Sequence, residues 1–293
     1  MDKSRADRDP SELPDFSFPG SVPRLTPGAR LRAEVVAMVR EQREYVELLH
    51  ALVRRDLALR YQNSFIGFGW AVFAPLLQML IFSVVFTRVV PLDTGIPYPV
   101  YAYAGLWSWN LFAASLRFAG TSLTANPNLV TKVYFPREIL PFSAVVVSLF
   151  DFAVASTVLG LLMWYYGIEV GWSLAFLPVI VVVQLAFTAG LALLVSMAHL
   201  FYTDVKHIFE LVLTVWMFAT AVLYPVERIG GTLGRVLQLN PMTPIIDAYR
   251  SVLLRNALPD AGPFAAAAGI AILTFLVSWI VFHRAEFRFA EEI

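Results

Sequence analysis

Three arginines stand where a phosphate-bearing ligand could be held. Arg54, Arg55 and Arg60 lie close together, just before the first long apolar run of the chain. The guanidinium group is a planar fork of N–H donors that binds phosphate oxygens in pairs. The same residues could equally be positively charged anchors that fix the orientation of a membrane segment. The sequence leaves both interpretations open.

Other ionisable residues are sparse. Asp151 falls near the middle of the third apolar run, where a charge is costly, so we expect it to face protein or a cavity or to be protonated. A structural hydrogen bond to a neighbouring helix is favoured over a proton relay, because the other runs offer no evident partner at that depth. His199, Asp204 and His207 are metal-ligand types without regular helical spacing, and we expect no metal site.

Residues 126–141 form a polar stretch between two apolar runs. Its apolar residues fall at helical spacing, and Pro136 would end a helix one turn later. A short amphipathic helix held between two membrane helices suits a soluble partner that pushes on it. The alternative is that its aromatic residues anchor the loop at the headgroup level. The apolar residues are Leu129, Val130, Val133 and Tyr134.

The composition defines the class of protein that must position these residues. Hydrophobic residues make up 58% of the chain and charged residues only 15%, with a mean hydropathy of +0.66. A soluble domain carries about 25% charged residues, so this chain has too little charge for a water-facing surface. We therefore expect an integral membrane protein. The chain has no cysteine, which excludes disulfides and thiolate metal sites.

The chain divides into three parts. Residues 1–30 are polar and rich in proline, which predicts a disordered cytoplasmic tail. Residues 31–62 carry charges on one helical face and predict an amphipathic interface helix, although a solvated helix would show the same pattern. Residues 63–293 predict an all-α membrane domain with six spans, each near the 20 residues that a crossing needs. The spans are expected at 66–90, 100–118, 140–166, 174–200, 208–224 and 264–282.

The distribution of Lys and Arg predicts the orientation. The short loops 91–99 and 167–173 contain neither residue, which places them outside and both termini in the cytoplasm. The loop 225–263 would also be external, yet it is apolar and is interrupted by Pro241 and Pro244. Irregular backbone at membrane depth needs cover from protein or a cavity. We expect two short re-entrant helices that form an external gate; a plain surface loop is the alternative.

Seven segments, in the same order along the chain, resemble the motifs of ABC-2 permeases that export polysaccharides such as O-antigen, capsule, teichoic acid or galactan. The resemblance covers nearly everything after residue 48. One position departs from it, because Thr203 stands where that family commonly has Arg. The segments are 57–75, 105–109, 132–141, 202–208, 224–225, 240–241 and 248–250.

The resemblance implies a transport subunit and not an enzyme. Similar permeases are homodimers that work with two copies of a separate ATPase, which binds ATP and Mg²⁺. This chain has no Gly-x-x-x-x-Gly-Lys-Ser/Thr loop of its own. The implied substrate is an undecaprenyl-diphosphate-linked polysaccharide, as in lipopolysaccharide biosynthesis, moved outward across the cell inner (plasma) membrane. No nucleic acid partner is expected.

The resemblance also implies roles for individual residues. Arg54, Arg55 and Arg60 would form a lipid-diphosphate entrance. Aromatic residues pack against the C–H faces of sugars and could line a substrate channel near the external mouth, or could instead be interfacial anchors. The expected ATPase-coupling residues are Asn128, Leu129, Lys132, Val133, Tyr134, Phe135, Arg137 and Glu138. The expected channel residues are Phe73, Tyr101, Tyr103, Trp107 and Trp109, and the external gate comprises Asn240, Pro241, Tyr249 and Arg250.

Two other functions fit parts of the pattern. An ABC-2 exporter of a lipid or small molecule would share the topology, and only the detailed motifs and the aromatic density favour a polysaccharide. An intramembrane enzyme that acts on lipid-linked glycans would need clustered carboxylates or a nucleophile with a base. Asp151 alone does not supply such a cluster.

Overall fold

We analysed a computed structural model of the chain, which describes residues 45–62, 67–92, 94–133, 135–202, 204–225, 234, 237 and 239–289. The predicted tail 1–30, residues 31–44 of the predicted interface helix, most of the loop 226–238, and Tyr134 lie outside the described residues.

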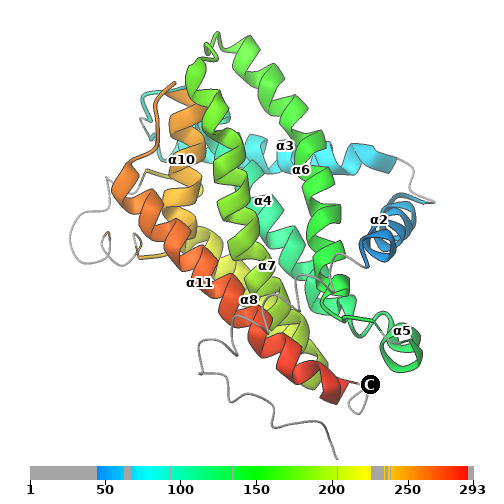
Figure 1. Cartoon of the computed structure of the whole chain (residues 1–293). Coiled ribbons are helices and arrows are strands. Elements are labelled where there is room, and N and C mark those ends of the chain that lie inside the picture. Colours follow the sequence, from blue (N-terminus) through cyan, green and yellow to red (C-terminus); the bar gives the residue numbers. More distant parts are fainter. Residues whose placement is uncertain are drawn as a thin grey trace, which may run out of the picture. The chain divides into compact units, whose positions relative to one another are not determined.

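Every regular element of the described residues is helical, which confirms the predicted all-α class (Figure 1). The α-helices are α2 (Val46–Tyr61), α3 (Trp70–Val84), α4 (Tyr98–Ser122), α5 (Pro127–Lys132), α6 (Ile139–Tyr165), α7 (Leu177–Phe201), α8 (Val205–Ala219), α10 (Met242–Leu254) and α11 (Ala261–Ala285). Short turns of other helix types are η2 (Gly67–Gly69), η3 (Val85–Val89), η4 (Trp172–Phe176) and η6 (Glu286–Arg288).

Prolines mark where several helices begin. Pro127 opens α5, and proline also occupies the first turn of α4 and α7. Proline is favoured there because its missing N–H would have no partner inside the helix and its φ angle is already helical. At the start of α11 the Asp260 carboxylate caps the helix by accepting from the Gly262 N–H at 3.4 Å.

Helix α4 forms the centre of the membrane domain. It packs against α3, α6, α7, α8 and α10, and most of its side chains are buried (Figure 1). Two of its aromatic side chains donate hydrogen bonds to α6, whereas the buried Ser115 hydroxyl has no partner among the described residues. The Tyr103 hydroxyl donates to the Ala155 carbonyl at 3.0 Å, and Trp107 Nε1 donates to the Phe152 carbonyl at 2.8 Å. These bonds fix α4 against α6, since an unpaired polar group inside an apolar domain would be costly.

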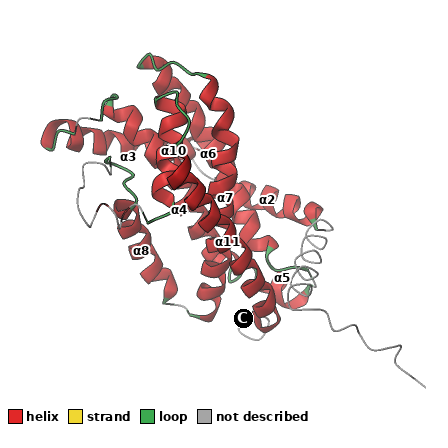
Figure 2. Ribbon diagram, turned by 60° about the vertical axis from the view of Figure 1, so that its left-hand side comes forward, coloured by secondary structure: helices red, strands yellow, loops and turns green. Residues whose placement is uncertain are grey.

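Four of the predicted spans are long and apolar enough to cross a membrane: Trp70–Val89, Ile139–Tyr165, Trp172–Phe201 and Ala261–Arg288. Helix α4 is long but less apolar, and α8 has 15 residues. Figures 1 and 2 show α3 running crosswise to α4, α6 and α7. The structure therefore supports a helical membrane protein, without establishing six crossings.

One predicted helix is shorter than expected and another predicted feature is described only in part. Helix α5 ends at Lys132, and Val133 is already extended, so the helix is shorter than the apolar spacing suggests. Residues 239–241 form a turn that leads into α10, with Pro241 as its N-cap. Residues 234 and 237 before this turn are helical, and the rest of the first predicted re-entrant helix lies outside the described residues.

Candidate functional site

A polar cluster fastens α2 to α6. Arg60 Nη1 lies 2.5 Å from Asp151 Oδ2, and the Tyr61 hydroxyl donates to Asp151 Oδ1. The side chains of Arg60 and Asp151 are only 23% and 17% exposed, so solvent screens their charges weakly. Burial, together with the bond to Asp151, raises the pKa of Tyr61, which therefore stays a neutral donor at physiological pH. The expected structural hydrogen bond of Asp151 to a neighbouring helix is confirmed.

A groove of about 540 Å³ opens beside this cluster, between α2, the end of α4 and the start of α6. Two of the three arginines predicted to form an entrance, Arg55 and Arg60, line it, whereas Arg54 is exposed and does not. The other lining residues are Asp56, Leu59, Phe118, Thr121, Ser122, Ala125, Asn126, Ser143, Ala144 and Val147.

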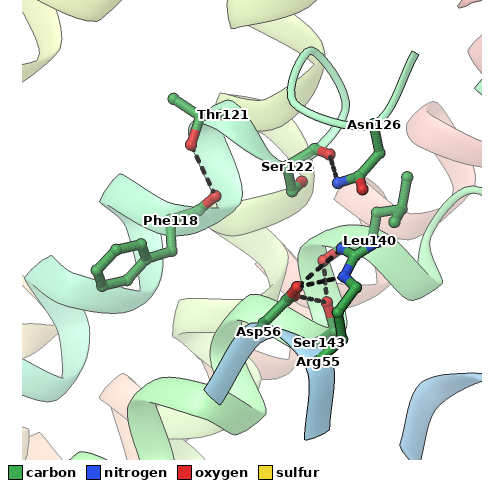
Figure 3. A network of polar contacts seen from close by, with 8 residues as sticks. All are labelled: Arg55, Asp56, Phe118, Thr121, Ser122, Asn126, Leu140 and Ser143. Carbon is green, nitrogen blue, oxygen red and sulfur yellow. Dashed lines mark hydrogen bonds and ion pairs between the residues drawn. The ribbon is translucent and has the colours of Figure 1, made fainter. Parts of the chain in front are cut away.

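Figure 3 shows how the polar groups of this groove are held. Arg55 Nε donates to Asp56 Oδ1 at 2.9 Å, and Asp56 Oδ2 lies 3.5 Å from the Ser143 hydroxyl of α6. On the α4 side, Asn126 Nδ2 donates to the Ser122 carbonyl at 2.8 Å. The groove therefore presents guanidinium, hydroxyl and amide groups along apolar walls, together with the Asp56 carboxylate that pairs with Arg55.

A second cavity of about 240 Å³ lies between α3, α4 and α6. Asp151 lines this cavity, while its ion-pair partner Arg60 lines the groove. The Arg60 guanidinium also covers the Phe118 ring at 3.9 Å. The ion pair thus has one member in each of the two spaces. The second cavity is also lined by Trp70, Gln78, Trp107, Asn110 and Arg117.

The tip of the loop that holds α5 is exposed. Asn128, Lys132 and Val133 face solvent, and Val133 is 46% exposed despite being apolar. Leu129 is partly buried and Val130 fully buried. This tip is therefore the part of the predicted coupling loop that a soluble partner could contact.

Of the other predicted coupling residues, Tyr134 lies outside the described part, and Phe135 and Glu138 are buried. Phe135 is 3% exposed and Glu138 is 1% exposed, so neither can be a surface anchor or rim residue in this conformation. Arg137 Nη2 donates to the Val130 carbonyl at 3.2 Å, which fastens α5 to the start of α6. These residues connect the loop to the start of α6 from inside. The sequence predicts that the helix ends before Pro136, but it does not predict that the residues next to that proline are buried.

Two residues of the predicted external gate, Arg250 and Asn240, bind the chain where α8 ends, and Arg250 also contacts the predicted channel residue Tyr101. Buried Arg250 donates from Nη1 to the Ala221 carbonyl at 3.2 Å and from Nη2 to the Val222 carbonyl at 2.5 Å. Its guanidinium covers the Tyr101 ring at 3.7 Å. Asn240 donates to the Thr220 hydroxyl at 2.8 Å. The Arg250 bonds satisfy carbonyl groups of the turn that follows α8, and Asn240 Nδ2 also donates to the carbonyl of Ala219, the last residue of the helix, at 3.3 Å.

The predicted channel aromatics lie inside the chain. Tyr101, Tyr103, Trp107 and Trp109 are at most 3% exposed, and only Phe73, at 48%, reaches a surface. Trp107 stacks on Phe152 at 3.8 Å between centroids, in the core of α4 and α6. This burial leaves Tyr103 and Trp109 almost no exposed surface within the chain, whereas Trp107 lines the second cavity. The sequence could not show this, because aromatic residues at span ends look the same in either role.

One cluster was missed by sequence reasoning. Glu138, at the start of α6, meets His283 and Glu286 at the end of α11, with ligand atoms within 4.8 Å of one another. His283 Nδ1 lies 2.9 Å from Glu138 Oε1. The spacing of His283 and Glu286 places both on one helical face, but Glu138 is 145 residues away from His283 in sequence.

The fold is that of a helical membrane protein with an exposed loop around α5 and an arginine-lined groove beside α2. Residues 47–254 match the family described as ABC-2 type transporter, and the chain belongs to that family. It is 34% identical over 262 residues to an O-antigen export system permease protein of Myxococcus xanthus, covering 88% of this chain and all of that relative. It is also 28% identical over 247 residues to an O-antigen export system permease protein of Klebsiella pneumoniae, covering 84% of this chain and 94% of that relative.

Proposed function

We propose that this chain is the transmembrane subunit of an ATP-driven exporter that moves undecaprenyl-diphosphate-linked polysaccharide from the cytoplasm to the outer side of the inner membrane. The observation that carries the proposal is the groove beside α2, which places Arg55 and Arg60 along apolar walls. Two arginines match a diphosphate, and the walls match a polyprenyl chain. The similarity to O-antigen export permeases over most of the chain favours a polysaccharide cargo over a small molecule.

The ion pair between Arg60 and Asp151 is the proposed control point on the substrate path. A diphosphate in the groove offers more charge and more acceptor oxygens than one carboxylate, so it competes with Asp151 for Arg60. Exchange of partners would loosen α2 from α6 at the boundary with the second cavity. The lipid head would then pass from the groove toward the space between α3, α4 and α6.

The assembly that we propose is a homodimer of six-span chains with two ATPase subunits, both termini of each chain being cytoplasmic. The ATPase binds ATP and Mg²⁺ and contacts the exposed tip of the α5 loop. The apolar side chains of α3 follow one helical face, which supports cover by a second copy or by lipid. They are Trp70, Phe73, Leu77, Leu80, Ile81 and Val84, each 46–60% exposed.

The first test compares two neighbouring arginines in a transport assay. Arg55→Gln removes a cation from the groove, whereas Arg54→Gln removes an exposed cation of the same helix outside it. The permease and its ATPase are reconstituted together in proteoliposomes with lipid-linked polysaccharide, and ATP-dependent translocation is followed with a lectin on the far side. Loss of a charged hydrogen bond of about 1.5–3 kcal/mol predicts a rise in apparent KM of roughly tenfold or more for Arg55→Gln.

Two results would contradict the proposal. Equal KM values for the two variants and the unmodified chain would remove the groove as the diphosphate entrance. A purified permease that never retains an ATPase when it is expressed with its chromosomal neighbours would remove the ATP-driven exporter itself.

A further inference from the structure

We propose that Glu138, His283 and Glu286 form a binding site for a divalent transition-metal ion of the zinc class, where the end of α11 meets the start of α6. This site lies outside the substrate groove and beyond the proposed export function. Its ligand types, one imidazole nitrogen and two carboxylate oxygens, form a set that zinc commonly accepts.

The ligand atoms lie close to the spacing of a tetrahedral ion. Zinc–ligand bonds of about 2.0–2.2 Å at tetrahedral angles place neighbouring ligand atoms about 3.3–3.6 Å apart. The 3.6 Å between His283 Nδ1 and Glu286 Oε1 matches that spacing, whereas His283 Nδ1 and Glu138 Oε1, 2.9 Å apart, would have to separate by a few tenths of an ångström. Small side-chain rotations would admit the ion. With three protein ligands the fourth position is left to water, which is typical of an exchangeable ion.

A second observation points to a ligand here. Glu138 is 1% exposed, and within the described part of the chain its Oε2 atom has no hydrogen-bond partner. Burying a carboxylate oxygen without a hydrogen-bond partner lowers the stability of the folded state. Two buried carboxylates at this separation also repel each other. A divalent cation would give the unpaired oxygen a ligand bond and would balance both charges at once.

The surroundings suit a metal site. Glu286 Oε2 lies 3.5 Å from the Arg137 N–H, a contact that orients the carboxylate in the way that outer partners orient metal ligands. His283 is 23% exposed and provides a route for the ion from solvent. The Arg137 side chain donates to the Val130 carbonyl of α5. An ion bound here would therefore link the end of α11 to the segment that contacts α5.

The alternative is a protonated His283 that pairs with Glu138 without metal. To separate the two, the full-length protein is purified in nanodiscs with a histidine-free tag, stripped with chelator and titrated with Zn²⁺. Zinc content is measured by mass spectrometry and Co²⁺ binding by visible absorption. We expect one equivalent per chain and the strong bands of tetrahedral Co²⁺. Glu138→Gln and His283→Gln should each weaken binding by about 100-fold, at least as much as loss of an outer partner.

The matched controls are Glu210→Gln and His50→Gln, which remove an exposed carboxylate and an exposed imidazole elsewhere. Both should retain the wild-type stoichiometry. A folded wild-type protein that takes up no stoichiometric zinc would overturn the proposal in favour of the imidazolium pair. Zinc binding that survives both cluster variants would also overturn it. If Glu138→Gln does not fold, the partly exposed His283 still provides the decisive variant, with the wild-type Co²⁺ spectrum as an independent readout.

Discussion

At the scale of single residues, the membrane domain accommodates its few polar side chains by pairing them. Asp151 receives both the Arg60 guanidinium and the Tyr61 hydroxyl from α2. Arg250, which is even more deeply buried, donates to two backbone carbonyls in the turn after α8 and covers the face of Tyr101. Each pairing joins elements that are far apart in sequence, so these residues stabilise the packing of one helix against another.

The Arg60–Asp151 pair should show a measurable coupling energy. Exposed ion pairs contribute about 0–1 kcal/mol, and breaking buried ones costs about 3–5 kcal/mol. Because this pair is partly buried, we expect a coupling near 2 kcal/mol between Arg60→Gln and Asp151→Asn in thermal unfolding of the detergent-solubilised chain. Strictly additive effects of the two substitutions would show that the contact contributes nothing.

Gly105 should tolerate no side chain. A Cβ atom there would lie 2.5 Å from Arg250 Nη2 and closer still to the Val222 carbonyl oxygen, so backbone would have to move. We expect Gly105→Ala to destabilise the chain by about 1–3 kcal/mol in thermal unfolding. The matched control is Gly160→Ala in α6, where no atom lies within 4 Å and a gain of up to about 1 kcal/mol is expected from helix propensity. Equal melting temperatures would contradict this close packing.

At the scale of elements, the loop around α5 divides into an outer and an inner part. The outer part presents Asn128, Lys132 and Val133 to solvent. The inner part buries Phe135 and Glu138 and joins them to α6 and the end of α11. This division suits a coupling element, because a push on the tip would be transmitted to helices rather than absorbed by a loose loop.

Substitutions in the outer part should therefore weaken ATPase binding, whereas substitutions in the inner part should lower the stability of the chain. Val133→Asp changes an exposed apolar contact, and we expect it to reduce co-purification of the ATPase by about tenfold while leaving the melting temperature unchanged. Phe135→Ala creates a cavity and should cost about 3–5 kcal/mol of stability. The measurement combines pull-down stoichiometry with thermal unfolding. Normal ATPase recovery in Val133→Asp would remove the tip from the proposed interface.

At the scale of the whole molecule, the number and direction of the spans remain a proposal that the chain itself makes easy to test. It contains no cysteine, so single cysteines can be placed in an unmodified background. Lys132, Glu169 and Leu258 are all exposed positions in three different loops.

We expect a membrane-impermeant maleimide to label Glu169→Cys and Leu258→Cys in intact spheroplasts. Lys132→Cys should react only in inverted vesicles, because the positive-inside pattern places its loop in the cytoplasm. Labelling of Leu258→Cys from the cytoplasmic side would mean that α8 does not cross, and the six-span proposal would fail.

The sequence by itself determined the class of the protein, its helices and its family. The low charge content requires a membrane environment, and long apolar runs bounded by proline and polar residues locate helices α3, α4, α6, α7, α8 and α11 within a few residues. The helix boundaries can be predicted because they depend on residues within one or two helical turns. The short motifs and their order along the chain likewise identify the family.

Only the tertiary structure decided which side chains face inward and which distant residues meet. Trp107 and Phe135 look like surface aromatics in the sequence but are both buried, and Trp107 stacks on Phe152 of α6. The meeting of Arg60 with Asp151, and of Glu138 with His283, depends on how helices pack across intervals of about 90 and 145 residues. Helical spacing defines the faces of one helix, but the partner of each face is set by packing and by the pairing of buried charges, which no local pattern records.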